Sequence, residues 1–124
     1  MNIDTTLQKL FSLHQFHIKL GLERIEQLLK FTGNPQNNLK CFHIAGSNGK
    51  GSTASFIASI LMEAGFKVGL YTSPHFKRFN ERIRINGNEI EDSYIINYMD
   101  SIESFIENNQ PTFFEITTGM AFKY

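Results

Sequence analysis

The stretch most suited to chemistry is AGSNGKGST, residues 45–53, in which small residues surround a lysine. Glycines let backbone N–H groups approach a ligand closely, and the lysine adds a charge that reaches phosphate oxygens. The common phosphate-binding loop has the pattern G-x-x-x-x-G-K-[ST]. With Gly49-Lys50 as the G-K pair, Ile44 replaces the leading glycine and Gly51 replaces the hydroxyl residue. The stretch therefore predicts a variant phosphate-binding loop, against the alternative of a plain glycine-rich turn.

The flanking segments are those that a phosphate site requires. Residues 40–45 are a short apolar run typical of a buried strand, and the spacing after the loop predicts a helix that ends at Gly65. The N-terminus of that helix adds unpaired N–H donors and partial positive charge, and Lys50 would reach the β and γ phosphates of a nucleotide. The candidate nucleotide-binding residues are Gly46, Ser47, Asn48, Gly49, Lys50, Gly51 and Ser52.

A magnesium ligand has to come from outside this loop. In the common loop the hydroxyl after the lysine binds the metal, and Gly51 has none. Ser52 lies one residue further on, where it suits the α or β phosphate better. Residues 68–71 predict a second strand, and the loop at Thr72-Ser73 leaves the sheet edge that would carry the phosphates. Ser73 is therefore the candidate for the displaced hydroxyl.

The order strand, glycine loop, helix, strand predicts one right-handed parallel crossover. The predicted fold class is α/β, with a P-loop-type parallel sheet and flanking helices. Asn86-Gly87 predicts a hairpin turn. Apolar spacing and capping residues predict four further helices. The first is opened by Asp4 or Thr5 and has on its apolar face Leu7, Leu10, Phe11 and His14, and the second runs from Leu22 to Gly33. The third is opened by Asp92 or Ser93 and buries Ile95, Met99, Ile102, Phe105 and Ile106, and the last is opened by the capping box of Thr112 and Glu115.

Composition narrows the class of protein. The chain has 124 residues, and its twelve basic and twelve acidic side chains cancel. No overall field favours nucleic acid or an anionic membrane, and no apolar run approaches the roughly 20 residues of a membrane span. The start MNIDTTLQKL lacks the basic and apolar segments of a secretory signal. Cys41 is the single cysteine, which favours a reducing compartment. We expect a soluble, cytoplasmic protein.

Several blocks resemble one enzyme family. The segment FHIAGSNGKGS, residues 42–52, closely resembles the ATP loop of the folylpolyglutamate synthases and bifunctional dihydrofolate synthases, which belong to the Mur ligase superfamily. The same family is matched by LGLERI at 20–25, GNPQ at 33–36, LYTSP at 70–74, RFNERI at 78–83 and FE at 114–115. Ser47 stands where the family usually has Thr. Gly51 favours this branch over the cell-wall Mur ligases, which usually carry Thr there.

The resemblance implies an ATP-dependent, ADP-forming ligase that adds L-glutamate to a folate or dihydropteroate carboxylate through an acyl phosphate. ATP and Mg²⁺ are the implied cofactors, with Lys50 in the catalytic role, and Ser73 and Glu115 fall on family magnesium-ligand positions. A third ligand, a histidine, lies beyond Tyr124 in the family. The chain ends inside a predicted helix, so residues 1–124 are expected to be the N-terminal portion of the ATP-binding domain, inactive alone and monomeric when complete.

Other assignments stay open at this point. Glu115 is either a capping-box residue or a metal ligand. The basic residues Lys77, Arg78, Arg82 and Arg84 are either solvated or contact a folate carboxylate or the phosphates. The tentative substrate-binding residues are Pro74, His75 and Arg82. Alternative functions are a Mur-type amide ligase on another carboxylate and a non-catalytic nucleotide-binding fragment. The sequence does not separate dihydrofolate synthase from folylpolyglutamate synthase.

Overall fold

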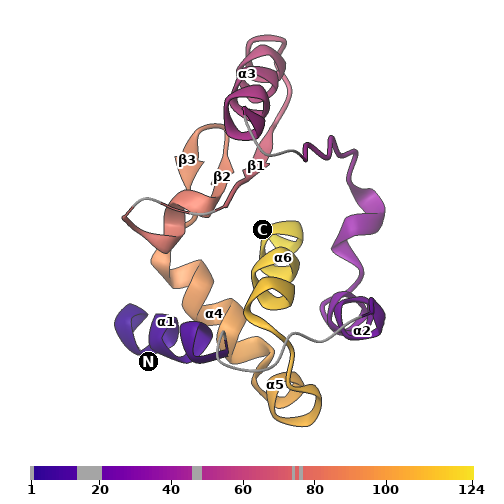
Figure 1. The fold of residues 1–124 in the computed structure, drawn as a ribbon, viewed down its shortest axis with the longest axis vertical. Coiled ribbons are helices and arrows are strands. Elements are labelled where there is room, and N and C mark those ends of the chain that lie inside the picture. Colours follow the sequence, from indigo (N-terminus) through magenta and orange to yellow (C-terminus); the bar gives the residue numbers. More distant parts are fainter. Residues whose placement is uncertain (1, 14–20, 46–48, 74, 76) are drawn as a thin grey trace. The chain divides into compact units, whose positions relative to one another are not determined.

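The computed structural model describes residues 2–13, 21–45, 49–73, 75 and 77–124. These residues form two compact units (Figure 1). Residues Met1–Leu39 and Asp92–Tyr124 make up the first, which we call the helical unit, and Lys40–Glu91 make up the second, which we call the sheet unit. Helices and a small sheet together confirm the predicted α/β class. Within the described residues, no helix has the length and apolar character needed to cross a bilayer.

The sheet unit contains α3 (Lys50–Glu63), β1 (Gly69–Tyr71), the 3₁₀ turn η3 (Phe79–Arg82), β2 (Ile83–Ile85) and β3 (Asn88–Glu89). The strands pair antiparallel in the order β1-β2-β3, with Leu70 opposite Arg84, and α3 packs against β1. Asn86 and Gly87 have φ angles of 50° and 83°, which a two-residue type I′ hairpin requires. The predicted helix, second strand and hairpin are therefore confirmed.

The predicted parallel crossover is wrong for the described residues. Residues 40–45 form no strand, and the three described strands pair only antiparallel. A central parallel strand needs hydrogen-bonded neighbours and cover on both faces. None of the described strands pairs with this segment, and the Phe42 side chain is 71% exposed. The apolar composition of residues 40–45 does not by itself make a strand, because strand pairing also needs a hydrogen-bonded neighbour.

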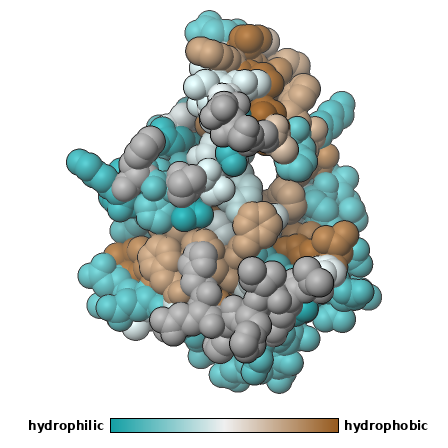
Figure 2. Space-filling view, in the orientation of Figure 1, coloured by the Kyte–Doolittle hydropathy of each residue, from teal (hydrophilic) through white to brown (hydrophobic). Residues whose placement is uncertain are grey.

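The α3 helix also carries uncovered apolar side chains. Phe56 and Ile60, one helical turn apart, are 69% and 67% exposed, and Phe66 beyond the end of the helix is 62% exposed. Figure 2 shows the corresponding apolar surface over α3 at the top of the view. A soluble domain normally covers such a face.

The helical unit contains α1 (Ile3–Ser12), α2 (Glu23–Phe31), the 3₁₀ turn η2 (Pro35–Asn38), α4 (Asp92–Ser101), α5 (Glu103–Asn109) and α6 (Phe113–Lys123). Helix α6 packs against α1 and α2, and α4 packs against α1 and α5. The core is aliphatic and aromatic, with buried side chains that include Leu10, Leu28, Ile95, Met99, Ile102, Phe105, Ile106, Ile116 and Met120. All five apolar residues predicted to face inward after Asp92 are buried.

Two details of the helices differ from expectation. Asn2, rather than Asp4 or Thr5, caps α1, because its side-chain oxygen accepts from the Thr5 N–H at 2.8 Å. The single helix predicted after Asp92 is divided into α4 and α5 at Ile102. The Ser101 hydroxyl donates to the Tyr98 carbonyl at 2.7 Å and shares that acceptor with the Ile102 N–H, an arrangement that bends helices. His14 lies outside the described residues.

Polar contacts at both ends hold α2 parallel to α6. Near the start of both helices, Arg24 Nε lies 3.1 Å from Glu115 Oε1, with side-chain exposures of 19% and 10%. The same oxygen accepts from the Thr112 N–H at 2.9 Å, which completes the predicted capping box. At the other ends, Lys123 Nζ donates to the Thr32 carbonyl at 3.1 Å. This lysine places a cation at the negative end of α2.

Gly119 lies where α6 approaches its neighbours most closely. A Cβ added there would meet the Tyr98 hydroxyl at 2.7 Å and Leu28 Cδ2 at 3.1 Å. The Tyr98 side chain is buried, and its hydroxyl has no hydrogen-bond partner among the described residues. Burial raises the pKa of the Tyr98 phenol, so the group stays neutral. Glycine is needed here for space rather than for backbone freedom.

We predict that Gly119→Ala lowers the free energy of unfolding by about 1–2 kcal/mol, because the Tyr98 ring cannot withdraw from a packed core. In a Tyr98→Phe background the same change should cost clearly less, since the nearest clashing atom is gone. Denaturant titrations of the four proteins measure both costs. Gly51→Ala is the control, because its added Cβ meets no atom within 4 Å. An equal cost in both backgrounds contradicts this account of the glycine.

We predict that Glu115→Ala destabilises the chain by about 2–3 kcal/mol, because it uncaps α6 and leaves the part-buried Arg24 without its charge partner. Glu115→Gln should cost less, since its amide oxygen still accepts from Thr112. The double change Arg24→Met with Glu115→Gln should recover part of the loss. Glu103→Gln, which breaks the exposed pair with Lys9, should change stability by no more than about 0.5 kcal/mol. Equal losses of unfolding free energy for Glu115→Ala and Glu103→Gln in denaturant titrations would contradict the larger contribution assigned to the pair of Arg24 and Glu115.

Candidate nucleotide and metal site

The start of α3 is an open helix N-terminus. Gly49 is its N-cap, with a left-handed φ of 74° and no side-chain cap hydrogen bond. The first intrahelical bond runs from the Thr53 N–H to the Gly49 carbonyl at 2.9 Å. The N–H groups of Lys50, Gly51 and Ser52 therefore have no acceptor within the helix. All four residues from 49 to 52 are exposed, and the first turn holds no acidic residue.

This geometry suits an anion. Unpaired N–H groups and the positive end of the helix dipole attract phosphate, and the exposed Lys50 adds a full charge to the same turn. Among the described residues, no atom lies within 4 Å of a Cβ added at Gly49 or Gly51. Gly46, Ser47, Asn48 and Pro74 of the predicted site lie outside the described residues.

The candidate hydroxyl follows β1. Ser73 is exposed and forms a bend shortly after Tyr71, the last residue of the strand. The preceding Thr72 N–H donates to the Arg82 carbonyl at 2.8 Å. Ser73 lies in the sheet unit with α3, whereas Glu115 lies in the helical unit. Among the described residues, no group of three or more His, Cys, Asp and Glu side chains could hold a metal ion.

His75 and Arg82 are bound to each other. Arg82 Nε donates to His75 Nδ1 at 2.7 Å, so the imidazole is neutral and carries its proton on Nε2. Burial lowers the pKa of His75, and the positive charge of Arg82 lowers it further, against a smaller raising effect of Glu81. Burial also lowers the pKa of the Arg82 guanidinium, which remains a cation. The guanidinium carbon lies 5.9 Å from the centroid of the Phe79 ring.

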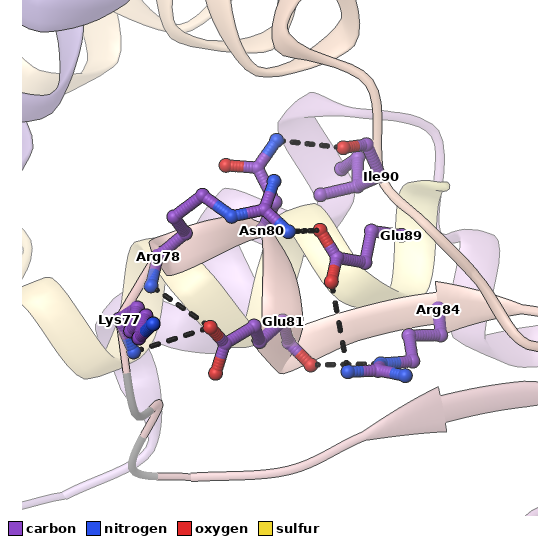
Figure 3. Close-up of polar contacts among 7 residues, drawn as sticks. All are labelled: Lys77, Arg78, Asn80, Glu81, Arg84, Glu89 and Ile90. Carbon is purple, nitrogen blue, oxygen red and sulfur yellow. Dashed lines mark hydrogen bonds and ion pairs between the residues drawn. The ribbon is translucent and has the colours of Figure 1, made fainter.

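The side chains of Arg78 and Arg84 contact Glu89 (Figure 3). Glu81 instead contacts the backbone of Lys77 and Arg78. Arg78 Nη2 lies 2.7 Å from Glu89 Oε1, and Arg84 Nη2 lies 3.6 Å from Glu89 Oε2. Glu81 Oε2 accepts from the Lys77 and Arg78 N–H groups at 3.1 and 3.0 Å. Glu89, on β3, therefore partly neutralises the positive charges of Arg78 and Arg84.

Glu115 has the structural role that its spacing indicated. Its Oε1 caps α6 and contacts Arg24, and its side chain is 10% exposed. Only Oε2 is left for a metal without breaking these contacts. The partnership with Arg24 was not predicted, because the two residues lie 91 positions apart and no local spacing links them. Asn80 was missed for a similar reason: its buried amide Nδ2 donates to the Ile90 carbonyl at 2.8 Å across the hairpin.

Comparison with known proteins shows which sequences this chain resembles. No protein-family model matches it. It is 47% identical over 116 residues to the dihydrofolate synthase/folylpolyglutamate synthase of Bacillus subtilis, and this match covers 89% of the chain but 27% of the relative. The chain therefore spans about a quarter of the length of that relative.

Solved structures show the same relation. The Escherichia coli protein FolC in complex with DHPP and ADP superposes with a TM-score of 0.89 at 38% identity, over 99% of this chain and 30% of that one. A folylpolyglutamate synthase in complex with AMPPCP superposes with a TM-score of 0.86 at 37% identity, over 100% of this chain and 31% of that one. In sequence and in fold, the chain is thus similar to the folylpolyglutamate synthases and dihydrofolate synthases over about a quarter to a third of their length.

Proposed function

We propose that this sequence is part of an ATP-dependent, ADP-forming ligase that joins L-glutamate to the carboxylate of a folate or a dihydropteroate. The observation that most directly supports this proposal is the exposed N-terminus of α3 directly after Gly49, which has no side-chain cap and holds Lys50 in its first turn. Relatives with the same fold were solved with ADP and with AMPPCP. Residues 1–124 are the N-terminal portion of the ATP-binding domain in this proposal.

The chemistry balances in two steps. The folate carboxylate oxygen attacks the γ phosphorus of ATP, which forms an acyl phosphate and breaks the bond to the β-phosphate oxygen, so that ADP leaves. The glutamate amine then attacks the acyl carbon, the C–N bond forms, phosphate leaves with the C–O electron pair, and the amine gives up a proton. The protein contributes positioning and charge stabilisation, without a nucleophilic side chain. Lys50 and the first N–H groups of α3 would hold the β and γ phosphates.

Magnesium would offset charge between the phosphates and the carboxylate. Ser73 is the proposed hydroxyl ligand, because it is exposed beyond the end of β1 and replaces the hydroxyl that Gly51 lacks. For Glu115 we propose first a structural role, as the cap of α6 and the partner of Arg24. Metal binding by Glu115 would then use Oε2 alone, since Oε1 is engaged.

The remaining proposals concern the rest of the protein. Of the tentative substrate-binding residues, His75 lies in the loop after β1, Arg82 ends η3, and Pro74 lies outside the described residues. We propose that the loop after β1 contacts the folate. We propose a monomeric, cytoplasmic enzyme that binds neither nucleic acid nor membrane. Because the chain spans about a quarter of the length of the Bacillus relative, we expect the 124 residues alone to release little ADP. A polypeptide of the full length of the relatives should release ADP only when both a folate or pteroate and glutamate are present. Turnover by such a polypeptide with neither co-substrate would contradict the ligase assignment.

We predict that magnesium–ATP binds saturably to the chain and that Lys50→Ala weakens this binding about 10- to 100-fold, since it removes one charge-assisted contact to phosphate. Titration calorimetry measures both affinities, and circular dichroism verifies that both proteins are folded. Lys67→Ala is the matched control, because Lys67 is an exposed lysine of the same unit outside α3. Equal affinity of the Lys50→Ala and Lys67→Ala variants would contradict the proposed phosphate site.

We predict that Ser73→Ala reduces the gain in nucleotide affinity that magnesium provides, and leaves the affinity measured in EDTA unchanged. The reason is that the serine would contact the metal and not the phosphates. Calorimetric titrations with and without magnesium measure the two values. Ser59→Ala, a change at an exposed serine of α3, should alter neither. If Ser73→Ala weakens binding equally in both conditions, Ser73 is not the metal hydroxyl.

A further inference from the structure

Arg82 contacts two points of the loop that carries Ser73, namely Thr72 and His75. At the start of the loop, the Thr72 N–H donates to the Arg82 carbonyl at 2.8 Å. Within the loop, His75 Nδ1 accepts from Arg82 Nε at 2.7 Å. Ser73 lies between these two contact points. The backbone and the side chain of one arginine therefore hold the chain on both sides of the candidate metal hydroxyl.

The far end of the same loop is held by a cap and by a buried hydrogen bond. Arg82 is the last residue of η3, a turn capped by Glu81 Oε2, which accepts from the Arg78 N–H at 3.0 Å. The buried Asn80 side chain bonds the Ile90 carbonyl at 2.8 Å and ties this turn to the end of the hairpin. Phe79 is 2% exposed and supports the Arg82 guanidinium at 5.9 Å from its ring centroid. The turn that carries Arg82 is thus tied to the hairpin, and the Arg82 guanidinium lies over the Phe79 ring.

Ser73 itself lacks comparable support. It is exposed, and it follows a strand of three residues. An exposed loop residue samples many conformations, and fixing its backbone costs about 1–2 kcal/mol of conformational entropy. A metal ligand that is already oriented avoids this cost when the metal binds. Contacts that fix Thr72 and His75 therefore raise the affinity that a hydroxyl at Ser73 can provide.

We propose that Arg82 is a positioning residue for the Ser73 hydroxyl, and that it acts through His75 and Thr72 rather than by contact with the folate carboxylate. This inference rests on the proposed role of Ser73 as a magnesium ligand. It assigns the RFNERI segment, residues 78–83, to the metal part of the site. It also makes His75 the acceptor that orients the Arg82 guanidinium.

The first test measures loop order without any ligand. In the wild-type chain the Thr72 amide should be protected from hydrogen exchange by its bond to Arg82. In Arg82→Lys, which keeps the charge but loses Nε, and in His75→Ala, exchange at Thr72 and Ser73 should be faster by about tenfold. His75→Gln, which restores an acceptor oxygen, should recover part of the protection. Arg84→Lys, on the neighbouring strand, is the control and should leave these amides unchanged.

The second test measures nucleotide affinity by calorimetry with no folate present. Arg82→Lys and His75→Ala should each reduce magnesium–AMPPCP affinity about 3- to 10-fold and leave affinity in EDTA unchanged. The double variant should be no weaker than either single variant, because both changes remove the same contact. A residue that bound only the folate carboxylate would change none of these values.

The outcomes distinguish a failure of the proposed nucleotide site from a failure of the proposed positioning role of Arg82. If the wild-type chain binds no nucleotide, the proposed function fails for this chain. Independently of that result, unchanged hydrogen exchange at Thr72 and Ser73 in the Arg82→Lys and His75→Ala variants overturns the inference about Arg82. If nucleotide binds and the Arg82 and His75 variants lose affinity equally with and without magnesium, or lose none, Arg82 does not act through Ser73. Loss confined to the magnesium-dependent affinity, together with faster exchange, supports the inference.

Discussion

The N–H groups at the start of α3, which have no acceptor within the helix, are the feature on which the functional account depends. A left-handed Gly49 begins the helix without a side-chain cap, and the first turn is exposed and holds no acidic residue. Within the described part of the chain, these donors have no acceptor. Most helices satisfy these donors with a serine, threonine or aspartate. Leaving them open costs stability, and a bound anion is the partner that would recover it.

The elements around this turn supply what a nucleotide site needs beyond phosphate contacts. Helix α3 packs against β1, and the loop that follows β1 presents Ser73. That loop is attached to a short hairpin through Arg82, His75 and the capped turn η3. A hairpin of such short strands is marginal by itself. The buried Asn80 contact and the Glu89 ion pairs give it local support.

Sequence patterns predicted the parts of this structure that depend on near neighbours. The hairpin turn at Asn86-Gly87, the capping box of Glu115 and the buried face of α4 and α5 all follow from local spacing and were confirmed. The parallel strand at 40–45 was wrong for the described residues, because strand pairing depends on distant partners. The ion pair of Arg24 with Glu115 and the hydrogen bond of Arg82 with His75 were not predicted, since side-chain contacts across a fold leave no periodic signal.

The central claim is that the first turn of α3 and the loop after β1 form the surface that binds nucleotide phosphates and their metal. Amide chemical-shift mapping by NMR, with magnesium–AMPPCP added stepwise to the isotope-labelled chain, tests it most directly. The account predicts saturable shifts at residues 49–53 and at Thr72 and Ser73, with the amides of α4 and α5 unaffected. Shifts centred on α4 and α5, or none at residues 49–53 in a folded chain, would contradict it.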